Sequence, residues 1–404
     1  MRIALFTENY YVGGLDTYII TLINNWPNED DQFILICNKS HPGINRYENE
    51  IKRDVEFIWH NHFHKNFFNK FILNFFNSVF LLKVVRRILS NMSCLFLINY
   101  LFFLKKTLLK SEPDRLIVVN GGYPGGLLCR AATICWGLYS NKESSIHNFH
   151  NIAISTSKFN IYQNLIDKFV EKYSKSLISV SNCSAESIRT RKSFQKTKKL
   201  SFIYNGIGDK NDCQYEDFRD ILNIDKVSNI CLMLGTYEER KGHKFILKVF
   251  KEVLKKNKNT YLIVCGFGSV LEKKAVKDYA MEIKVDKNVL FLNFVNGINN
   301  LFAITDILLI GSQEFESFGL TAVEAMLNRV PVVSTNTGGL KEVVENNNGG
   351  FVFDKNDYIG FSNKVIELLN NKKMGIEQGN KGHKRVKEKF SASRMSEMYY
   401  KAIQ

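Results

Sequence analysis

The sequence is poor in proline and lacks the motifs that most directly identify a function. Only 5 of its 404 residues are proline, and no stretch is rich in Pro, Gly and Ser, which argues against a long flexible linker. Apolar residues make up 45% and charged residues 24% of the chain. This composition excludes a disordered or collagen-like chain and is typical of a globular protein with about two domains.

Paired cysteines and a secretion signal are also missing. The eight cysteines are scattered without any C-x-x-C pair, so we interpret them as small buried residues in a reducing compartment. The N-terminal segment MRIALFTENY has too short an apolar run for a signal peptide, because Glu8 ends it. We therefore expect a cytoplasmic protein that begins with a β-strand.

Short apolar runs alternate with amphipathic segments along the chain. The runs that predict strands are 3–6, 33–37, 115–119, 176–180 and 201–204, followed by 230–234, 261–265, 289–292, 307–310 and 331–334. Helical periodicity lies between them, for example at 245–254. This alternation predicts an α/β fold with parallel sheets covered on both faces. Two series of strands predict two Rossmann-like, doubly wound domains.

A polar segment at 205–228 separates the two series of strands. We place the first domain at 1–207 and the second at 208–387. The remaining residues, 388–404, are predicted to form a C-terminal helix that packs back on the first domain.

Residues 57–111 interrupt the first series and carry much of the formal net charge of +15. The segment contains eight Lys and Arg residues and no acid. Its uncharged run at 88–104 lies at the lower limit of a bilayer span. Three interpretations remain: a transmembrane helix, core helices of the first domain, or amphipathic helices on an anionic membrane surface.

Two glycine-containing turns follow predicted strands. Gly13 and Gly14 come after the first strand and precede a helix, where backbone N–H groups can approach a ligand, although a plain tight turn has the same pattern. The strand 230–234 leads into Gly235 and then the adjacent cations Arg240 and Lys241. Such cations suit a phosphate or diphosphate, and the alternative is a solvated charged turn. No complete G-x-G-x-x-G or P-loop motif occurs.

Two glutamates eight positions apart form the most informative pattern. Glu316 lies in the loop after strand 307–310, and Glu324 lies on the helix that is expected to start near Gly319. The N–H groups of residues 318–320 favour an anion between them. A nucleotide-diphosphate sugar fits this layout, with the sugar at Glu316, the phosphates at the helix N-terminus and the ribose at Glu324. The alternative is two unrelated surface glutamates.

Taken together, these motifs resemble a known family. The segment ESFGLTAVEAM (316–326), the later PVVSTNTGGLKEVV (331–344), NGI (205–207), the Arg240-Lys241-Gly242 turn and the Gly13-Gly14 loop are similar to the motifs of retaining glycosyltransferase family 4. The resemblance covers most of the chain and is weakest over 57–111. It implies the GT-B fold, in which two Rossmann-like domains face each other across a cleft.

The resemblance also implies roles for individual residues. In the family, the acceptor lies mainly in the N-terminal domain and the donor mainly in the C-terminal domain. The expected catalytic residues are Glu316, Lys241, Arg240 and His150. The expected donor-binding residues are Gly13, Gly14, Gly235, Val295, Phe318, Gly319, Leu320 and Glu324, with Phe294 beside Val295 at the nucleobase. No metal site is expected, because protein cations would stabilise the leaving nucleotide diphosphate.

Two positions leave alternatives open. The family's phosphate turn usually has an arginine where this chain has Thr236, and Arg240 is a candidate for the second cation. The family's histidine near the reacting sugar corresponds to His147 or His150, and we favour His150. Alternate histidines at 60, 62 and 64 have no nearby carboxylate, so we do not predict a metal there.

The resemblance implies a metal-independent hexosyltransferase that uses a UDP- or GDP-sugar. Its acceptor would be a glycan or a polyprenyl-diphosphate-linked glycan in bacterial capsule, O-antigen, lipopolysaccharide or exopolysaccharide synthesis, at the inner face of the cell membrane. The alternatives are a GT-B sugar-nucleotide epimerase, a membrane-binding protein without catalysis and a basic nucleic-acid-binding protein. For the last, no RNA- or DNA-binding motif is present.

Overall fold

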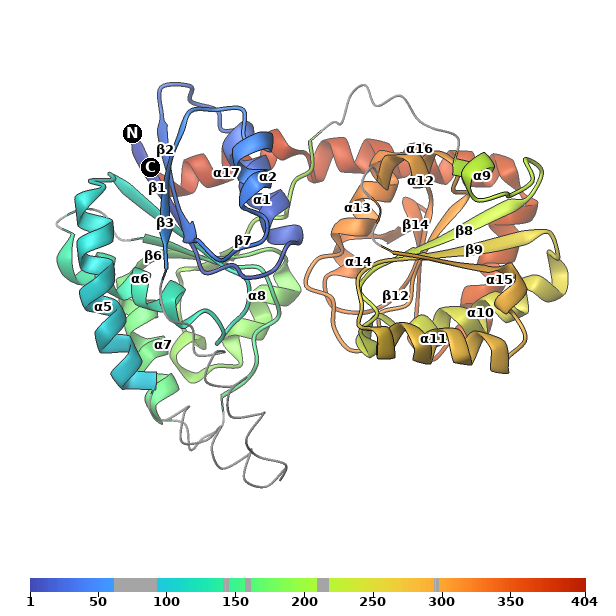
Figure 1. The fold of residues 1–404 in the computed structure, drawn as a ribbon, viewed down its shortest axis with the longest axis horizontal. Coiled ribbons are helices and arrows are strands. Elements are labelled where there is room, and N and C mark those ends of the chain that lie inside the picture. The colour runs from blue at the N-terminus through green and yellow to red at the C-terminus, as the bar shows by residue number, and fades with distance from the viewer. Residues whose placement is uncertain are drawn as a thin grey trace. The chain divides into compact units, whose positions relative to one another are not determined.

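The chain folds into two compact α/β units in a computed structural model (Figure 1). The structure describes residues 1–61, 93–140, 142, 145–156, 161–208, 218–293, 295 and 298–404. One unit contains Met1–Tyr204 together with Met395–Gln404, and the other contains Asn205–Arg394.

The N-terminal unit is built on seven parallel strands in the order β3-β2-β1-β4-β5-β6-β7. The strands are β1 (Arg2–Thr7), β2 (Gln32–Asn38), β3 (Val55–His60), β4 (Arg115–Asn120), β5 (Ser145–Phe149), β6 (Ser174–Ser179) and β7 (Leu200–Phe202). The central strands are buried on both faces, as Ile3 and Phe6 in β1 show with no exposed surface. Their continuous apolar runs therefore fit a sheet covered on both sides.

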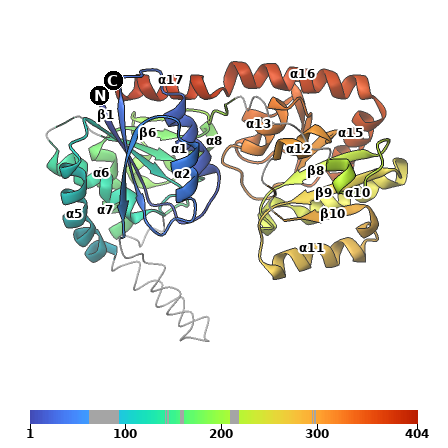
Figure 2. The same ribbon diagram turned by 45° about the horizontal axis from the view of Figure 1, so that its top comes forward.

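Helices cover both faces of this sheet (Figures 1 and 2). The helices of the unit are α1 (Gly14–Asn24), α2 (Ile44–Glu50), α5 (Ser93–Lys110), α6 (Leu127–Tyr139), α7 (Ile161–Tyr173), α8 (Asn182–Arg189), the short η1 (Lys192–Phe194) and α17 (Ala392–Ile403). One core cluster joins α5, α6, α7 and α8 to the sheet, and another joins α1, α2 and α17 to the opposite face. The last turns of the chain thus complete the N-terminal core through Met395, Tyr399 and Ile403.

The C-terminal unit repeats this architecture with the strand order β10-β9-β8-β11-β12-β14-β13. Its strands are β8 (Asn229–Leu234), β9 (Thr260–Cys265), β10 (Val289–Leu292), β11 (Ile307–Ile310), β12 (Val332–Thr335), β13 (Glu345–Asn346) and β14 (Gly349–Phe353). Its helices are α9 (Phe218–Ile221), η2 (Glu239–Lys241), α10 (His243–Lys256), α11 (Val270–Glu282), η3 (Asp286–Asn288), α12 (Ile298–Ala303), α13 (Leu320–Leu327), α14 (Leu340–Val343), α15 (Tyr358–Asn370) and α16 (Lys372–Lys389).

The predicted fold class is confirmed, since both units are doubly wound parallel sheets and every predicted strand is present. In each sheet the direction of strand order reverses beside the first strand, between β1 and β4 and between β8 and β11. Loops that leave the carboxyl ends of strands at such a reversal form the usual ligand crevice of open α/β sheets. The sequence motifs at Gly13, Gly235 and Glu316 follow β1, β8 and β11 respectively.

Of the segment 57–111, the structure describes β3 and α5. His60 ends β3 and is buried, whereas His62 and His64 lie outside the described residues. α5 turns Leu97, Tyr100, Leu104 and Leu108 into the N-terminal core. Among the helices that the structure describes, none is long and apolar enough to cross a membrane.

Candidate functional site

The C-terminal unit places a lysine and a glutamate in contact at the reversal between β8 and β11. Lys241 lies in η2, after β8, and Glu316 lies in the loop after β11. The Lys241 Nζ is 2.5 Å from Glu316 Oε2, and the two side chains are only 20% and 16% exposed. Partial burial strengthens their electrostatic attraction relative to a pair on the open surface. The structure therefore joins two of the predicted site residues, which are 75 positions apart in sequence.

Polar residues that follow neighbouring strands hold Glu316 in place. The Ser312 hydroxyl donates to the same Oε2 at 3.2 Å, and Thr335 and Thr337 donate their hydroxyls to the Ser312 carbonyl. Among the described residues Oε1 of Glu316 has no hydrogen-bond partner, which leaves it as an acceptor for a ligand hydroxyl.

The Glu316 backbone is held as firmly as its side chain. The N–H of Gly339 donates to the Glu316 carbonyl at 2.8 Å. Gly338 has φ = 57°, and a Cβ at this position would lie 2.1 Å from the same carbonyl oxygen. Only glycine fits both the left-handed backbone and the close approach. The TGG segment at 337–339 thus positions Glu316, a role that the sequence alone does not assign.

Arg240 makes different contacts from its neighbour Lys241. Its Nε lies 2.5 Å from Glu238 Oε2, and its guanidinium stacks 4.8 Å over the Phe315 ring. Thr236 donates its hydroxyl to the same carboxylate at 2.8 Å. Partial burial opposes ionisation of Glu238, but the hydrogen bonds from Arg240 and Thr236 outweigh it and lower the pKa of that carboxyl. Thr236, which replaces the family's usual arginine, therefore anchors the turn through Glu238.

α13 begins beside Glu316 and carries the other predicted residues. Gly319 is its N-cap, and no side chain caps the helix. Leu320 is the first residue, and Glu324 lies half-buried about one turn further along the eight-residue helix. Phe318 is buried against the Phe390 ring at 5.6 Å, so its side chain belongs to the core. This helix start offers the positive end of a backbone dipole to an anion.

The remaining donor-site candidates of this unit lie at strand ends. Gly235 directly follows β8, and a Cβ there would lie 3.7 Å from Lys241 Cδ, which places the glycine beside the lysine stem. Val295 is half-buried and follows β10. Phe294 lies outside the described residues.

In the N-terminal unit, the loop at Gly13 and Gly14 leads into α1. Gly13 donates its N–H to Asp16 Oδ2 at 2.9 Å. Asp16 is fully buried, accepts hydrogen bonds from Asn9 and Tyr47, and lies 3.0 Å from His41 Nε2. Burial raises the pKa of Asp16, yet these hydrogen bonds outweigh burial and keep it low. A buried carboxylate thus shapes the glycine loop.

The two candidate histidines of this unit differ in their surroundings. His147 is fully buried inside β5, with Nδ1 2.7 Å from the Thr133 hydroxyl and Nε2 3.3 Å from the Asn120 amide nitrogen. His150 directly follows β5 and packs against the Tyr18 ring of α1 at 4.2 Å. Its Nε2 has no hydrogen-bond partner among the described residues. The position of His150 past the strand end fits a contact with a ligand better than that of His147.

Sequence reasoning missed the residues that support Glu316, namely Ser312, Thr335, Thr337 and Gly338. A usable signal is present, because Ser312, Thr335 and Thr337 lie at or within two residues of the ends of β11 and β12, which are neighbours in the sheet. Among the described residues there is no cluster of three or more His, Cys, Asp and Glu side chains with the arrangement of a metal site.

The sequence is similar to those of known glycosyltransferases. Residues 214–385, in the C-terminal unit, match the family model described as glycosyl transferases group 1. A capsular polysaccharide biosynthesis glycosyltransferase, CapM of Staphylococcus aureus, is 24% identical over 72% of this chain and 77% of its own length. A UDP-Gal:alpha-D-GlcNAc-diphosphoundecaprenol alpha-1,3-galactosyltransferase of Escherichia coli is 22% identical over 88% of this chain and 84% of its own length.

A solved structure extends the likeness to the whole fold. Anabaena Alr3699/HepE in complex with UDP and glucose matches 99% of this chain and 98% of its own with a TM-score of 0.72, at 16% identity. The two parallel sheets of the present chain are accordingly those of a GT-B protein, as the sequence predicted.

Proposed function

We propose that the protein, which carries a glycosyl transferases group 1 domain, moves a sugar from a nucleotide-diphosphate donor to a glycan or lipid-linked acceptor with retention of anomeric configuration. The observation that carries this proposal is the contact between Lys241 and Glu316 at the reversal point of the C-terminal sheet, beside the start of α13. A fixed carboxylate, a cation and a helix N-terminus are the three groups that a sugar diphosphate needs.

Each group has a defined task in this proposal. Glu316 accepts hydroxyl hydrogen bonds from the donor sugar through Oε1 and so orients the anomeric carbon. Lys241 uses one of its three N–H donors on Glu316 and turns the others to the diphosphate, with Arg240 as a second cation. Glu324 accepts the ribose hydroxyls. The charge that develops on the departing nucleotide diphosphate is stabilised by Lys241 and the α13 dipole, so no divalent metal takes part.

The relatives support a particular class of substrates. The Escherichia coli relative is named for a UDP-sugar and a diphosphoundecaprenol-linked acceptor, and the Anabaena protein was solved with UDP and glucose. By analogy we propose a UDP-sugar as the first donor to test and a polyprenyl-diphosphate-linked glycan as acceptor, in the synthesis of a bacterial surface polysaccharide. His150, Gly13 and Gly14 are the residues of the N-terminal unit that we assign to this reaction.

Donor profiling tests the proposal directly. The purified protein is incubated with UDP- and GDP-sugars in the presence and absence of a diphosphoundecaprenol-linked glycan, and free nucleotide diphosphate is measured with and without EDTA. We expect release that depends on the acceptor and persists in EDTA, and a product whose anomeric configuration matches the donor by NMR. Conversion of the donor to an epimeric sugar nucleotide without an acceptor product would instead indicate an epimerase.

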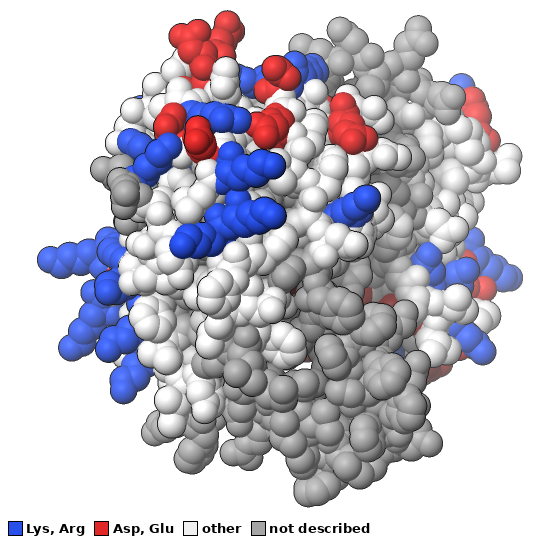
Figure 3. Space-filling model, turned by 60° about the vertical axis from the view of Figure 1, so that its left-hand side comes forward, with Lys and Arg blue, Asp and Glu red and all other residues white. Residues whose placement is uncertain are grey.

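We also propose that α5 and its neighbours attach the N-terminal unit to an anionic bilayer. α5 contains no acidic residue, and it exposes Ile98 and Phe102, the latter at 73% of its surface, beside Lys105, Lys106 and Lys110. An apolar stripe bordered by lysines is the composition that interfacial binding requires. The surface view toward this side of the unit shows uncharged surface bordered by Lys and Arg, with acids mainly near the top (Figure 3).

The exposed apolar surface continues beyond the segment that the sequence indicated. α5 packs on α6 and α6 packs on α7, so the three helices form one layer. The end of α6 exposes Leu138 and Tyr139, and the latter holds the Lys105 ammonium 4.4 Å over its ring. α7 exposes Ile161, Tyr162, Leu165 and Phe169. This layer, which we call the α5–α7 surface, would bring the acceptor-binding unit to lipid-linked substrates at the cytoplasmic face of the membrane.

A further inference from the structure

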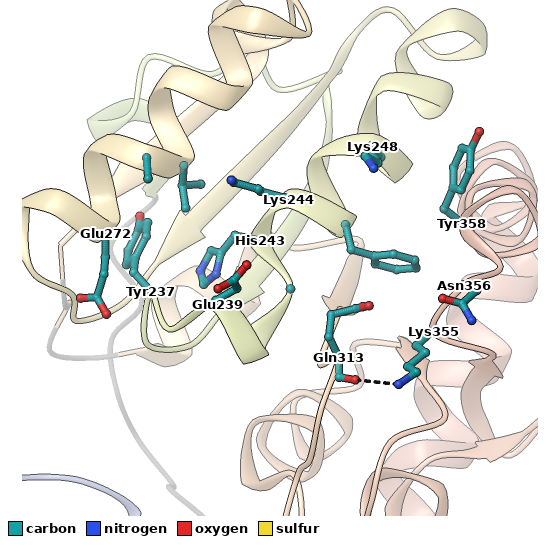
Figure 4. Close-up of a pocket in the computed structure, with 14 residues that line it drawn as sticks. Tyr237, Glu239, His243, Lys244, Lys248, Glu272, Gln313, Lys355, Asn356 and Tyr358 are labelled. Atoms are coloured by element: carbon teal, nitrogen blue, oxygen red, sulfur yellow. Dashed lines mark hydrogen bonds between the residues drawn. The ribbon is translucent and has the colours of Figure 1, made fainter. Parts of the chain in front are cut away.

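A cavity of about 640 Å³ lies in the C-terminal unit beside the turn between β8 and α10 (Figure 4). Tyr237, Glu239 and Gly242 of this turn line it, together with the first turn of α10 and residues from α11 and the start of α15. Neither Lys241, Glu316 nor Glu324 is among the lining residues. The cavity is therefore separate from the donor site proposed above.

The N-terminus of α10 opens into this cavity without a cap. Its N-cap is Gly242, which has φ = 74° and supplies no side-chain acceptor. A Cβ at Gly242 would lie 1.8 Å from the Gly311 carbonyl oxygen, so a residue with a capping side chain cannot replace it. The neighbouring helices differ, because Ser269 caps α11 and Asp357 caps α15. The first N–H groups of the 14-residue α10 thus face a cavity that favours negative charge.

His243 supplies an independent indication of a ligand. It lines the cavity, is only 3% exposed, and neither of its ring nitrogens has a hydrogen-bond partner among the described residues. Its ring stacks on Tyr237 with centroids 4.7 Å apart, which fixes the orientation of the nitrogens. In Figure 4 the ring lies between Tyr237 and Glu239 in the cavity wall. A buried polar group without a partner is costly, and a bound hydrogen-bonding ligand removes that cost.

Three lysines add positive charge to the same cavity. Lys244 and Lys248 are exposed and stand four residues apart on α10, so they share one face of the helix. Neither forms a salt bridge among the described residues, although the Lys244 ammonium lies 5.6 Å over the Tyr279 ring of α11. Like charges four residues apart repel each other unless an anion lies between them. Lys355 reaches the cavity from the turn before α15, with its Nζ 3.4 Å from the Gln313 carbonyl (Figure 4).

Two carboxylates and several rings line the rest of the cavity and narrow the class of ligand. Glu272 is held in the capping box of α11 by Ser269. Glu239 lines the cavity, and its carboxylate has no hydrogen-bond partner among the described residues, so it can accept a ligand hydroxyl. Tyr237, Phe245 and Tyr358 provide flat apolar surface. A bare anion would leave the carboxylate and the rings unused, whereas a phosphate ester of a polyol matches all three kinds of group.

We propose that this cavity binds a small sugar phosphate. The phosphate lies at the N-terminus of α10 between Lys244 and Lys248 and accepts a hydrogen bond from His243, and a sugar hydroxyl donates to Glu239. This site goes beyond the proposed donor and acceptor sites and makes no use of Glu316 or Lys241.

Binding of glucose 6-phosphate, measured by equilibrium dialysis or calorimetry on the full chain, tests the proposal. Glucose and inorganic phosphate serve as matched probes for the two halves of the ligand. We expect glucose 6-phosphate to bind at least about tenfold more tightly than either probe, since each half supplies only part of the contacts. Failure of glucose 6-phosphate to bind, or equal binding of inorganic phosphate, would overturn the proposed class of ligand.

Variants locate the binding. The double change Lys244→Gln and Lys248→Gln should weaken glucose 6-phosphate by about tenfold or more, because it removes two charge-assisted hydrogen bonds. Lys251→Gln, on an exposed position of the same helix, and Lys241→Gln, at the donor site, should each leave the affinity within about twofold. A loss caused by Lys241→Gln but not by the double change would place the ligand at the donor site and contradict the proposal.

The imidazole of His243 gives a second readout that needs no activity. Burial and the nearby charge of Lys241 lower the pKa of His243 to about 4. A phosphate beside the ring stabilises its protonated form, so glucose 6-phosphate should raise this pKa in a histidine-detected NMR titration. An unchanged His243 signal in saturating glucose 6-phosphate would refute the contact. His243→Phe, which keeps the ring stack on Tyr237, should weaken binding while the protein stays folded.

Discussion

The carboxyl edges of the two sheets present opposite kinds of chemistry. In the C-terminal unit the edge carries ionised groups that are part-exposed, above all Lys241 and Glu316. In the N-terminal unit the edge carries the imidazole of His150, and that of His147 lies behind it inside β5. Burial lowers the pKa of both to about 3, and the charge of Arg130 adds to the effect on His147. Two sheets that share the order of their first five strands thus differ, because one places an ion pair at this edge and the other a neutral imidazole, with its carboxylate Asp16 buried below.

This contrast fits the proposal that the C-terminal unit binds the donor diphosphate and the N-terminal unit binds the acceptor hydroxyl. A diphosphate carries charge throughout the reaction and needs cations that are already in place. A hydroxyl that attacks a sugar is neutral. A neutral imidazole beside it can accept a hydrogen bond without repelling the protein cations that bind the donor diphosphate.

Glu316→Ala should have the largest effect on activity. The change removes the only acceptor assigned to the donor sugar and leaves the Lys241 ammonium without its partner, so we expect turnover to fall by about a thousandfold. Release of nucleotide diphosphate with the glycan acceptor is the measurement. Glu314→Ala, an exposed glutamate two residues earlier, is the matched control and should keep wild-type turnover. Wild-type rates in Glu316→Ala would mean that the charged edge is not the reaction centre.

Lys241→Gln should lower turnover by about a hundredfold, the usual range for one lost electrostatic contact to a developing charge. The rate constant for nucleotide release should fall more than donor affinity, because the positive charge matters most when the leaving group departs. Steady-state kinetics with Lys251→Gln as control separates the two effects. A change confined to KM would show that Lys241 binds the donor without assisting the reaction.

The buried neutral imidazole of His147 should make the stability of the N-terminal unit fall as the pH is lowered. The folded pKa of His147 is about 3, well below the ordinary value of 6.5, so the unfolded chain binds the proton first as the pH falls. Stability from this residue is complete above pH 6.5 and declines toward pH 3. At pH 5 the loss should amount to about 2 kcal/mol, at 1.36 kcal/mol per pKa unit.

Tryptophan fluorescence makes this loss measurable in one unit. All three tryptophans, Trp26, Trp59 and Trp136, belong to the N-terminal unit. Urea unfolding followed by their fluorescence at pH 7.5 and pH 5.0 should show the decline in the wild type and a smaller decline in His147→Gln. Equal pH dependence of the two proteins would show that His147 is accessible to protons in the folded state.

The sequence revealed the charged edge far better than the neutral one. Glu316, Lys241 and the glycines occur in short motifs, and each follows an apolar strand that periodicity identifies. The network that fixes Glu316 through Ser312, Thr335 and Gly338 depends on which strands are neighbours, and strand order is not written in local sequence. The cavity at α10 escaped for a similar reason, because three separate helices bring its residues together.

The N-terminal unit shows where local patterns mislead. β3 (Val55–His60) and β5 (Ser145–Phe149) include polar or charged residues, so they lack the continuous apolar runs by which the other five strands of this unit were predicted. α7 alternates polar and apolar residues like any amphipathic helix, and only the structure shows that Ile161 and Phe169 remain exposed. An apolar residue at a helical spacing predicts burial, but the spacing alone does not identify the surface that covers it.

The smallest expected effect is on vesicle binding by the α5–α7 surface, measured with lysine variants in each of the two units. Wild-type protein should float with vesicles that contain anionic lipid and less with neutral ones, and salt should weaken the binding. The change Lys105→Glu with Lys106→Glu should lower the partition constant for anionic vesicles by at least about tenfold, since each lost cation contributes up to roughly 1 kcal/mol before screening by salt. The charge-matched control, Lys251→Glu with Lys256→Glu on α10 of the C-terminal unit, should bind like wild type.

Phe102→Ser tests the apolar part of the α5–α7 surface, whose contribution to binding should persist at high salt because it does not depend on charge. Equal losses from both pairs of lysine variants would indicate general basicity in place of a docking surface, and a wild-type protein that floats with neither kind of vesicle would point to a soluble acceptor.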